Sequence, residues 1–569
     1  MIFKLHVEDR TYTKFTLLNA STLRVDDTMP AFNPIEHKLF NQDIFDYDEA
    51  LNIIIIQHSS ARSMQNIPGV LVLEGNKRYG KYKQKFLYKC IPDDKRLPIF
   101  MTPYSIKRGF NKRLYNKYVI FKFNNWENKH PCGTLMQTLG DVTVLSNFYE
   151  YQLYCKSLYA SIQNFTKIAK ANLKNQVKKA ELISKMKEIY NTEDRTDWDI
   201  ITIDPLNSKD FDDAFGYKDI SDNECCLSIY ISNVSFWMDI LDLWDSFSER
   251  IATIYLPDRK RPMLPTILSD TLCSLQENQI RFAFTLDIIL DKQNMKIVDH
   301  SFKNTCIRVR KNFRYDTEEQ EKDTLYQTVF KIVREMNIHQ KYIDKIVNSH
   351  DLIAYLMILM NYISATYLIT QKTGIFRSAK FNSNFVPPTT LPGDIQKFLK
   401  MWNSSGGQYA KHGQINSHDM LQLDAYVHIT SPIRRLVDLL NIMIIQDSLN
   451  LMKLGSKNLE FYNKWTNDPA LEYINKTMRS IRKVQNDCDL LNICATDKKL
   501  LDEVYTGFIF DKIIRNDKLY QYMVYLPKFK MVNRFISRYE KDNLTKQQFK
   551  LYVFKDENQL KHKIRVELQ

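Results

Sequence analysis

Four aspartates lie within ten residues of one another at the end of a predicted strand: Asp204, Asp210, Asp212 and Asp213, in the segment IDPLNSKDFDDA. Like charges this close raise one another's pKa values, so the four cannot all ionise without a counter-cation. Carboxylate oxygens are the ligands that Mg²⁺ and Mn²⁺ prefer, and positions left open on the ion accept phosphate and water. We interpret the segment as a divalent-metal site, with a solvated acidic turn as the alternative.

Two later segments carry groups that suit a nucleotide. The segment ATIYLPDRKRPMLP (252–265) is a proline-rich loop in which Tyr255 could hold a nucleotide beside the metal, and packing of that ring is the alternative. The segment DAYVHITSPIRRLVDL (424–439) predicts a helix with Arg434 and Arg435 in its first turn. Cations are unfavourable at that end of a helix dipole, so we expect an anionic phosphate to be their partner.

Together these segments closely resemble the ribonuclease II (RNB) family of hydrolytic 3′→5′ exoribonucleases. The resemblance is carried by ITIDPLNSKDFDDA, by IYLPDRKRPMLP with LCSL at 272–275, and by HITSPIRRLVDLL. In the first half, IPDDKRLP and HPCGTLMQTLG are similar to the second cold-shock barrel of the eukaryotic exosome-type branch. The resemblance covers nearly the whole chain and leaves no room for the N-terminal endonuclease domain of some members.

The resemblance implies a multidomain α+β fold, and the patterns along the chain agree with it. Short β-prone runs broken by turn residues fill the first 150 positions and recur after 504, whereas helical patterns dominate 318–370 and 438–496. The expected domains are a cold-shock-like barrel at 1–57, a second one at 58–150, the RNB catalytic domain at 151–499 and an S1-like OB barrel at 500–569.

The resemblance also implies roles for individual residues. The metal ligands would be Asp204, Asp210, Asp212 and Asp213, holding Mg²⁺ or, alternatively, Mn²⁺. The catalytic residues would be Asp212, Asp213, Arg434 and Tyr255, where Tyr255 positions the 3′-terminal nucleotide and Arg434 lies near the scissile phosphate. RNA contacts would come from Tyr255, Arg377, Arg434, Arg435, Phe313 and Tyr315, the last two with core packing as the alternative. The implied reaction is attack of a metal-activated water on the last phosphodiester of single-stranded RNA, which releases nucleoside 5′-monophosphates.

The chain departs from the family at several positions. A glutamate pair of the family matches Ala354 and Tyr355, a histidine matches Ala379, and an aspartate matches Asn233. The His-Arg pair that follows DLL in the family is Ile442-Met443. These differences keep open a catalytically weak or inactive RNB-fold RNA-binding protein, and a protein acting on single-stranded DNA. Retention of all four carboxylates favours the enzyme.

The charge distribution favours a nucleic-acid partner. The 569 residues carry a net charge of +14, and residues 51–130 hold 16 Lys and Arg against 4 Asp and Glu. Twelve aromatic residues, from Tyr79 to Trp126, alternate with those cations. Binding of single-stranded RNA or DNA requires this combination of phosphate neutralisation and flat stacking surfaces, although many of these rings could instead form a barrel core.

The remaining composition bears on location. Nine cysteines with no C-x-x-C pair indicate a reducing compartment, and the N-terminus lacks the pattern of a signal peptide. The apolar run 352–369 contains Asn361 and three tyrosines, so we expect a buried helix and no membrane span. We therefore expect a cytoplasmic monomer.

Overall fold

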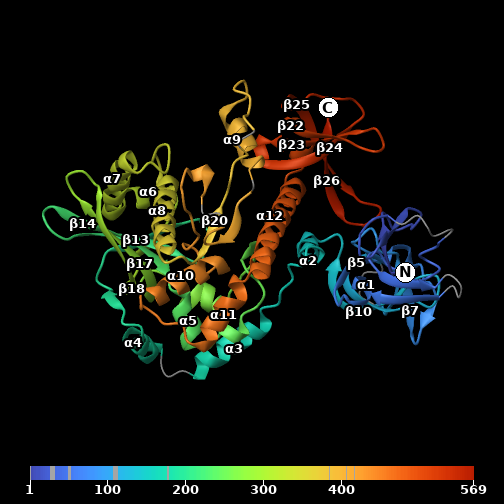
Figure 1. The fold of residues 1–569 in the computed structure, drawn as a ribbon, viewed down its shortest axis with the longest axis horizontal. Coiled ribbons are helices and arrows are strands. Elements are labelled where there is room, and N and C mark those ends of the chain that lie inside the picture. The colour runs from blue at the N-terminus through green and yellow to red at the C-terminus, as the bar shows by residue number, and fades with distance from the viewer. Residues whose placement is uncertain are drawn as a thin grey trace. The chain divides into compact units, whose positions relative to one another are not determined.

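The computed structural model describes residues 2–25, 32–48, 53–106, 113–175, 179–382, 385–404, 406–414 and 417–569. The chain divides into two compact units (Figure 1). One unit comprises 1–159, 256–259 and 480–569, and the other comprises 160–255 and 260–479. We call them the barrel unit and the core unit.

The barrel unit begins with a four-stranded antiparallel sheet. Its strands are β1 (Ile2–Val7), β2 (Phe15–Asn19), β3 (Ile44–Asp48) and β4 (Ile53–His58), in the order β2-β1-β3-β4. Alternate side chains of β1, namely Phe3, Leu5 and Val7, are buried against Phe45. The period-two burial is that of a sheet with one covered face.

The second sheet closes on itself. Its strands are β5 (Ile67–Leu71), β6 (Lys81–Tyr82), β7 (Lys85–Pro92), β8 (Phe100–Tyr104), β9 (Lys117–Asn125) and β10 (Cys132–Asp141). Strand β5 pairs with both β9 and β7, which completes a small barrel. At this closure a side chain on Gly69 would lie 2.9 Å from the carbonyl oxygen of Ile91 and from the Phe121 ring. Only glycine permits so close an approach.

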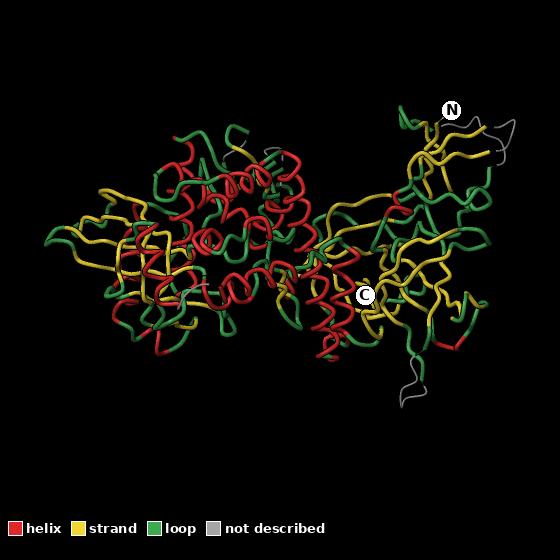
Figure 2. The backbone as a smooth tube through the Cα atoms, turned by 90° about the horizontal axis from the view of Figure 1, so that it is seen from below, coloured by secondary structure: helices red, strands yellow, loops and turns green. Residues whose placement is uncertain are grey.

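The C-terminal sheet belongs to the same unit. Strands β22 (Tyr505–Ile514), β23 (Tyr520–Leu526), β24 (Met531–Ser537), β25 (Lys546–Lys555) and β26 (His562–Leu568) are antiparallel in the order β24-β23-β22-β25-β26. Asp93 ties it to the second barrel, because Lys561 Nζ lies 2.6 Å from the Asp93 carboxylate. Short helices α1 (Ser60–Ser63) and α2 (Leu145–Cys155) complete a unit that is mostly strand and loop (Figure 2).

A seven-stranded mixed sheet forms the centre of the core unit. Its strands are β11 (Glu193–Arg195), β12 (Ile200–Asp204), β13 (Asp213–Asp219), β14 (Glu224–Ser232), β17 (Ile280–Asp291), β18 (Ile297–Arg308) and β19 (Lys311–Arg314). The order is β11-β18-β17-β14-β13-β12-β19. Eight of the nine residues of β14 are buried, which is the pattern of a strand covered on both faces.

Helices belong to the same unit as this sheet. They are α3 (Gln163–Asn175), α4 (Lys179–Ile189), α5 (Val234–Ile240), α6 (Glu318–Glu321), α7 (Thr324–His339), α8 (Ser349–Thr370), α9 (Gly393–Trp402), α10 (Leu436–Ser448), α11 (Ser456–Thr466) and α12 (Asp468–Thr496), which continues into the barrel unit. Helices α7 and α8 lie beside strands of the sheet (Figure 1), and side chains of α7, α8 and α10 share one core with it. Two pairs of antiparallel strands extend the unit: β15 (Ile254–Tyr255) with β16 (Lys260–Arg261), and β20 (Ile375–Ser378) with β21 (Gln408–Lys411).

The expectation of a buried helix at 352–369 is confirmed. Helix α8 is long and apolar enough to cross a membrane by length and composition, but most of that apolar stretch is buried inside the protein. Leu352, Leu356, Leu359 and Leu368 pack in the core beside the sheet. The four predicted domain ranges, 1–57, 58–150, 151–499 and 500–569, remain predictions.

Candidate active site

The four aspartates of the acidic segment lie on neighbouring strand ends and the loop between them. Asp204 is the last residue of β12, Asp213 is the first of β13, and these strands pair antiparallel. The LCSL segment fixes the intervening loop. Ser274 Oγ donates to the Lys209 carbonyl at 2.8 Å and accepts from the Phe211 amide at 3.1 Å. The loop that carries Asp210 and Asp212 is therefore held in place by its backbone.

Burial and mutual repulsion disfavour ionisation of this cluster. Burial, followed by the charge of Asp213, raises the pKa of Asp204 well above the usual range of a carboxyl group. Burial raises the pKa of Asp212 to about 7, although Arg434 opposes the shift. Burial also raises the pKa of Asp213, again against Arg434. Burial therefore favours the protonated form of these three carboxyls in the absence of a further cation.

Arg434 and the backbone before α10 hold Asp212. The Ile433 amide donates to Asp212 Oδ1 at 2.9 Å, and Arg434 Nε donates to Oδ2 at 3.2 Å. A second nitrogen of Arg434 donates to Ser431 Oγ at 2.8 Å. The TSPIRR segment thus brings a guanidinium group to the acidic loop across 222 residues of sequence.

The structure corrects the helix expected around the two arginines. Helix α10 begins at Leu436, and Arg435 is its N-cap in an extended conformation. The charged residue in the first turn of the helix is Asp438, which is buried. Its carboxylate accepts from the Ser431 amide at 2.8 Å and from the Arg435 guanidinium at 2.8 Å. The arginines therefore precede the helix, and an acidic residue occupies the position that its dipole favours.

Arg435 and Arg377, both predicted to contact RNA, have protein partners in this structure. Arg435 pairs with Asp438, and the Arg377 guanidinium lies 4.8 Å from the centre of the Tyr409 ring. The Arg377 amide also donates to the Tyr426 carbonyl at 2.7 Å, which links the paired strands β20 and β21 to the segment before α10. Their contacts with RNA remain predictions.

The Tyr255 hairpin approaches the acidic loop from another side. Tyr255 is 41% exposed, and its hydroxyl donates to Asp210 Oδ2 at 3.4 Å. Directly opposite Tyr255 in the β15–β16 pair is Lys260, whose Nζ lies 2.8 Å from Asp210 Oδ1 and 2.9 Å from Asp270 Oδ1. The sequence prediction missed Lys260 and Asp270. The DRKR run beside Tyr255 was the available signal.

Phe313 lies in the core of the sheet, whereas Tyr315 lies just beyond the end of β19 (Lys311–Arg314). Strand β19 runs parallel to β12 with Phe313 opposite Ile203, and Phe313 is 4% exposed in the core. This corrects the expectation that Phe313 stacks on RNA, because its ring faces the protein interior. Tyr315 lies just beyond the strand, where its amide donates to the Asp204 carbonyl at 3.2 Å and its ring stacks on His350 at 3.9 Å. The RNA contact of Tyr315 remains a prediction.

The donor set fits a divalent cation in its chemistry. Among the residues that the structure describes, no group of three or more His, Cys, Asp or Glu side chains is arranged so that it could hold a metal ion. Asp210 and Asp212 are instead held by Lys260 and Arg434. Asp204 Oδ2, however, is buried and has no hydrogen-bond partner in the described chain. An unsatisfied carboxylate oxygen in an acidic cluster suits a hard cation.

The sequence around this site matches a known domain. Residues 192–322 match the family model described as "RNB domain". This stretch is therefore similar to an RNB domain. A 121-residue stretch is 41% identical to "Ribonuclease R" of Ureaplasma parvum serovar 3, covering 21% of this chain and 16% of that protein. Over 286 residues the chain is 25% identical to "DIS3-like exonuclease 2" of Schizosaccharomyces pombe, covering 48% and 30%. The matches thus span less than a third of each relative's own length.

Solved structures resemble the whole fold. Mycoplasma genitalium RNase R in complex with ribose methylated single-stranded RNA aligns with a TM-score of 0.68 at 15% identity, over 100% of both chains. Yeast Ssd1, described as a pseudonuclease, aligns with a TM-score of 0.58 at 14% identity, over 97% of this chain and 80% of Ssd1. The expected α+β fold, with several OB-like sheets and an RNB-type core, is confirmed.

Most positions at which this sequence departs from the RNB family pattern are buried in the protein. Tyr355, Ile442, Met443 and Ala379 are all buried, whereas Ala354 is exposed on α8. Asn233 is buried too, and it accepts from Ser235 Oγ at 2.6 Å. Neither position of the family's glutamate pair supplies a carboxylate here.

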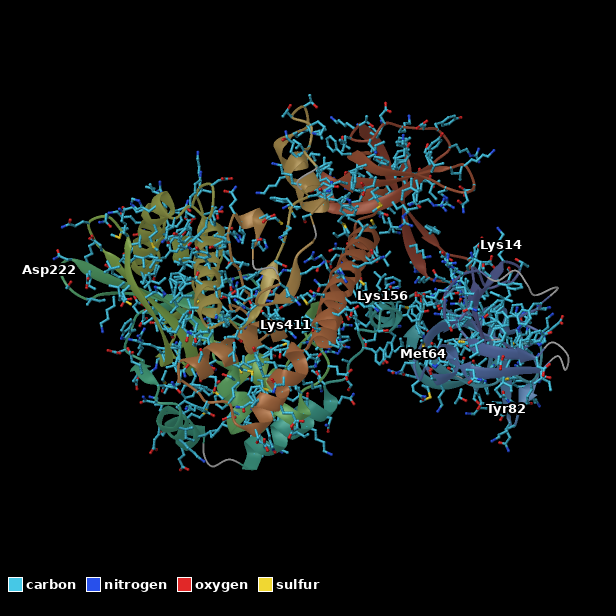
Figure 3. The ribbon with its side chains drawn as sticks, viewed as in Figure 1. Lys14, Met64, Tyr82, Lys156, Asp222 and Lys411 are labelled. Carbon is cyan, nitrogen blue, oxygen red and sulfur yellow. The ribbon has the colours of Figure 1, made fainter. Side chains whose placement is uncertain are left out.

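The predicted basic and aromatic surface is a second candidate site, wholly within the barrel unit. Five of the twelve rings (Tyr88, Phe100, Tyr118, Phe121 and Trp126) are buried, so for them the core alternative is correct. Phe110 lies outside the described residues. A cavity of about 1420 Å³ is lined by some of the remaining rings and by nearby cations, including Tyr82, Tyr104 and Tyr115 with Lys83, Lys85 and Arg113. Figure 3 shows Tyr82 on the β6–β7 hairpin.

Proposed function

We propose that the protein is a divalent-metal-dependent 3′→5′ exoribonuclease that hydrolyses single-stranded RNA to nucleoside 5′-monophosphates. The observation that carries this proposal is the gathering of Asp204, Asp210, Asp212 and Asp213 at the ends of β12 and β13, beside Arg434 and Tyr255. The names of the curated relatives, ribonuclease R and DIS3-like exonuclease 2, support the same class of reaction. The cysteine content favours a reducing compartment such as the cytoplasm.

Each group of residues in the site has its own role in the proposed reaction. Asp204, Asp210, Asp212 and Asp213 would hold the cation, which when bound supplies a water of lowered pKa and neutralises charge on the phosphate. Arg434 is fixed by Asp212 and Ser431 with 41% of its side chain exposed, so its guanidinium can stabilise charge on phosphoryl oxygens. The exposed ring of Tyr255 offers a stacking surface for the terminal base.

The direct test is degradation of 5′-end-labelled single-stranded RNA in Mg²⁺ by the intact protein and by Asp212→Asn. We expect the wild type to shorten the RNA from its 3′ end and to release 5′-monophosphates, EDTA to stop this, and Asp212→Asn to lower the rate at least about a hundredfold. Asp219→Asn, at the exposed far end of β13, the strand that follows Asp212, is the matched control and should keep the wild-type rate.

An RNA-binding protein without catalysis is the second candidate. It is favoured by the pairing of Asp210 and Asp212 with Lys260 and Arg434, which neutralises half of the acidic cluster without metal. Intact RNA after incubation with the wild type, together with equal RNA affinity of wild type and Asp212→Asn, would reject the exoribonuclease and support this candidate.

A further inference from the structure

The ammonium group of Lys260 is held between two carboxylates from different segments of the RNB domain. Asp210 comes from the acidic loop, and Asp270 comes from the short π-helix Leu268–Leu272 that leads into LCSL; their oxygens lie 2.8 and 2.9 Å from Lys260 Nζ. The Lys260 side chain is 21% exposed and that of Asp210 is 9% exposed. This is a partly buried ion pair at a carboxylate that the proposed function assigns to a divalent cation.

We propose that Lys260 is a resident counter-cation of the acidic site, which competes with the divalent cation for Asp210 and remains with Asp270 when the cation binds. The inference rests on the proposed function, because it concerns the same acidic loop. It assigns a positioning role to Lys260 and Asp270, and neither residue would contact RNA.

The contacts of Asp270 support this exchange, in which the divalent cation takes Asp210 and Lys260 stays paired with Asp270. Ser269 Oγ donates to Asp270 Oδ1 at 2.6 Å, so this carboxylate is held ready as an acceptor when Asp210 is withdrawn. Lys260 therefore has a second anionic partner, and its charge need not be left unpaired in a half-buried position. Leaving a buried charge without a partner would be strongly unfavourable. A lysine paired with Asp210 alone would have no anionic partner once the divalent cation takes Asp210.

The exchange would also affect Tyr255. Both oxygens of Asp210 are engaged by the β15–β16 hairpin, one by Lys260 and the other by the Tyr255 hydroxyl at 3.4 Å. The two residues lie directly opposite each other in the hairpin. A cation that takes Asp210 displaces both contacts together, so cation loading frees the tyrosine that the proposed function assigns to the terminal nucleotide.

The test is Mn²⁺ binding to the full-length, EDTA-treated protein without RNA, measured by isothermal titration calorimetry and by loss of the free Mn²⁺ signal in electron paramagnetic resonance. Lys260→Met should bind Mn²⁺ about tenfold more tightly than the wild type, as expected when a competing charge pair of this kind is removed. Lys260→Arg keeps the positive charge and should stay near the wild-type affinity. A general structural defect would weaken binding, which is the opposite direction.

Two further variants sharpen the result. Asp270→Asn removes the second partner of Lys260, so Mn²⁺ affinity should fall about threefold, and this effect should shrink in the Lys260→Met background. Lys457→Met is the matched control, since Lys457 also bridges two aspartates, Asp242 and Asp245, elsewhere in the same unit. It should leave Mn²⁺ affinity unchanged. Thermal unfolding of each variant confirms that it is folded.

The outcomes separate this proposal from the proposed function. Unchanged or weaker Mn²⁺ binding by a folded Lys260→Met protein that still degrades RNA rejects the role of Lys260 alone. Tighter Mn²⁺ binding by Lys260→Met in a protein that never degrades RNA rejects the exoribonuclease alone. Absence of Mn²⁺ binding in both wild type and Lys260→Met overturns the Lys260 proposal and the metal dependence together.

Discussion

The acidic site and the second barrel use charge in opposite ways. In the acidic site the charged groups are enclosed and fixed, as in Asp212, which is 3% exposed and held by the Ile433 amide and Arg434. In the barrel the cations are exposed and lie over aromatic rings, as in Lys81, 5.1 Å from the centre of the Phe86 ring. Bond cleavage requires fixed groups, whereas capture of a flexible polyanion requires accessible ones. Substitutions in the two regions should therefore fail in different ways.

The largest effect is expected from Arg434→Met. The substitution removes the cation beside Asp212 and the group placed to stabilise phosphoryl charge, so single-turnover cleavage of RNA should slow about a hundred- to a thousandfold. RNA affinity should change little, since we expect the barrel to supply most cationic contacts. Arg334→Met, at an exposed position of α7, is the control and should behave as the wild type. A variant that loses RNA affinity but keeps its single-turnover rate would contradict the assignment.

A smaller effect is expected when the charge of the barrel is reduced. The triple variant Lys81→Gln, Lys83→Gln and Lys85→Gln should weaken binding of single-stranded RNA about tenfold and flatten the dependence of affinity on salt. The cleavage rate at saturating RNA should remain that of the wild type. Fluorescence anisotropy at several salt concentrations measures the first effect, and single-turnover kinetics measure the second.

The matched control removes the same charge from the other unit. Lys167→Gln, Lys170→Gln and Lys174→Gln lie at exposed positions of α3, outside both candidate sites. Equal loss of affinity in the two triple variants would mean that net charge alone governs binding, and the distinction between barrel and core would then disappear.

The sequence predicted the acidic site better than it predicted the side chains around it. The aspartates of 204–213 are close in sequence, so their proximity needed only a strand end and a short loop. Lys260 reaches Asp210 through a hairpin register and a tertiary approach that local spacing does not encode. The sequence also could not distinguish Phe313 from Tyr315. The first lies inside β19, whose register with β12 turns it into the core, whereas the second lies just beyond the strand.

The last prediction concerns stability and pH, and it again separates the two regions. The pKa of Asp212 is raised from 3.8 to about 7 by burial, so between these values the folded protein binds a proton that the unfolded chain has lost. Stability of the metal-free protein should therefore fall as pH rises through this window, by up to about 4 kcal/mol. In EDTA, Tm should decrease by about 5 °C between pH 5 and pH 7.5. Asp212→Asn should reduce this slope and leave the part contributed by Asp204 and Asp213, whose pKa values burial also raises. The barrel triple variant, whose lysines stay charged throughout, should retain the full slope. An unchanged slope in Asp212→Asn would show that the Asp212 carboxyl is not among the groups that titrate.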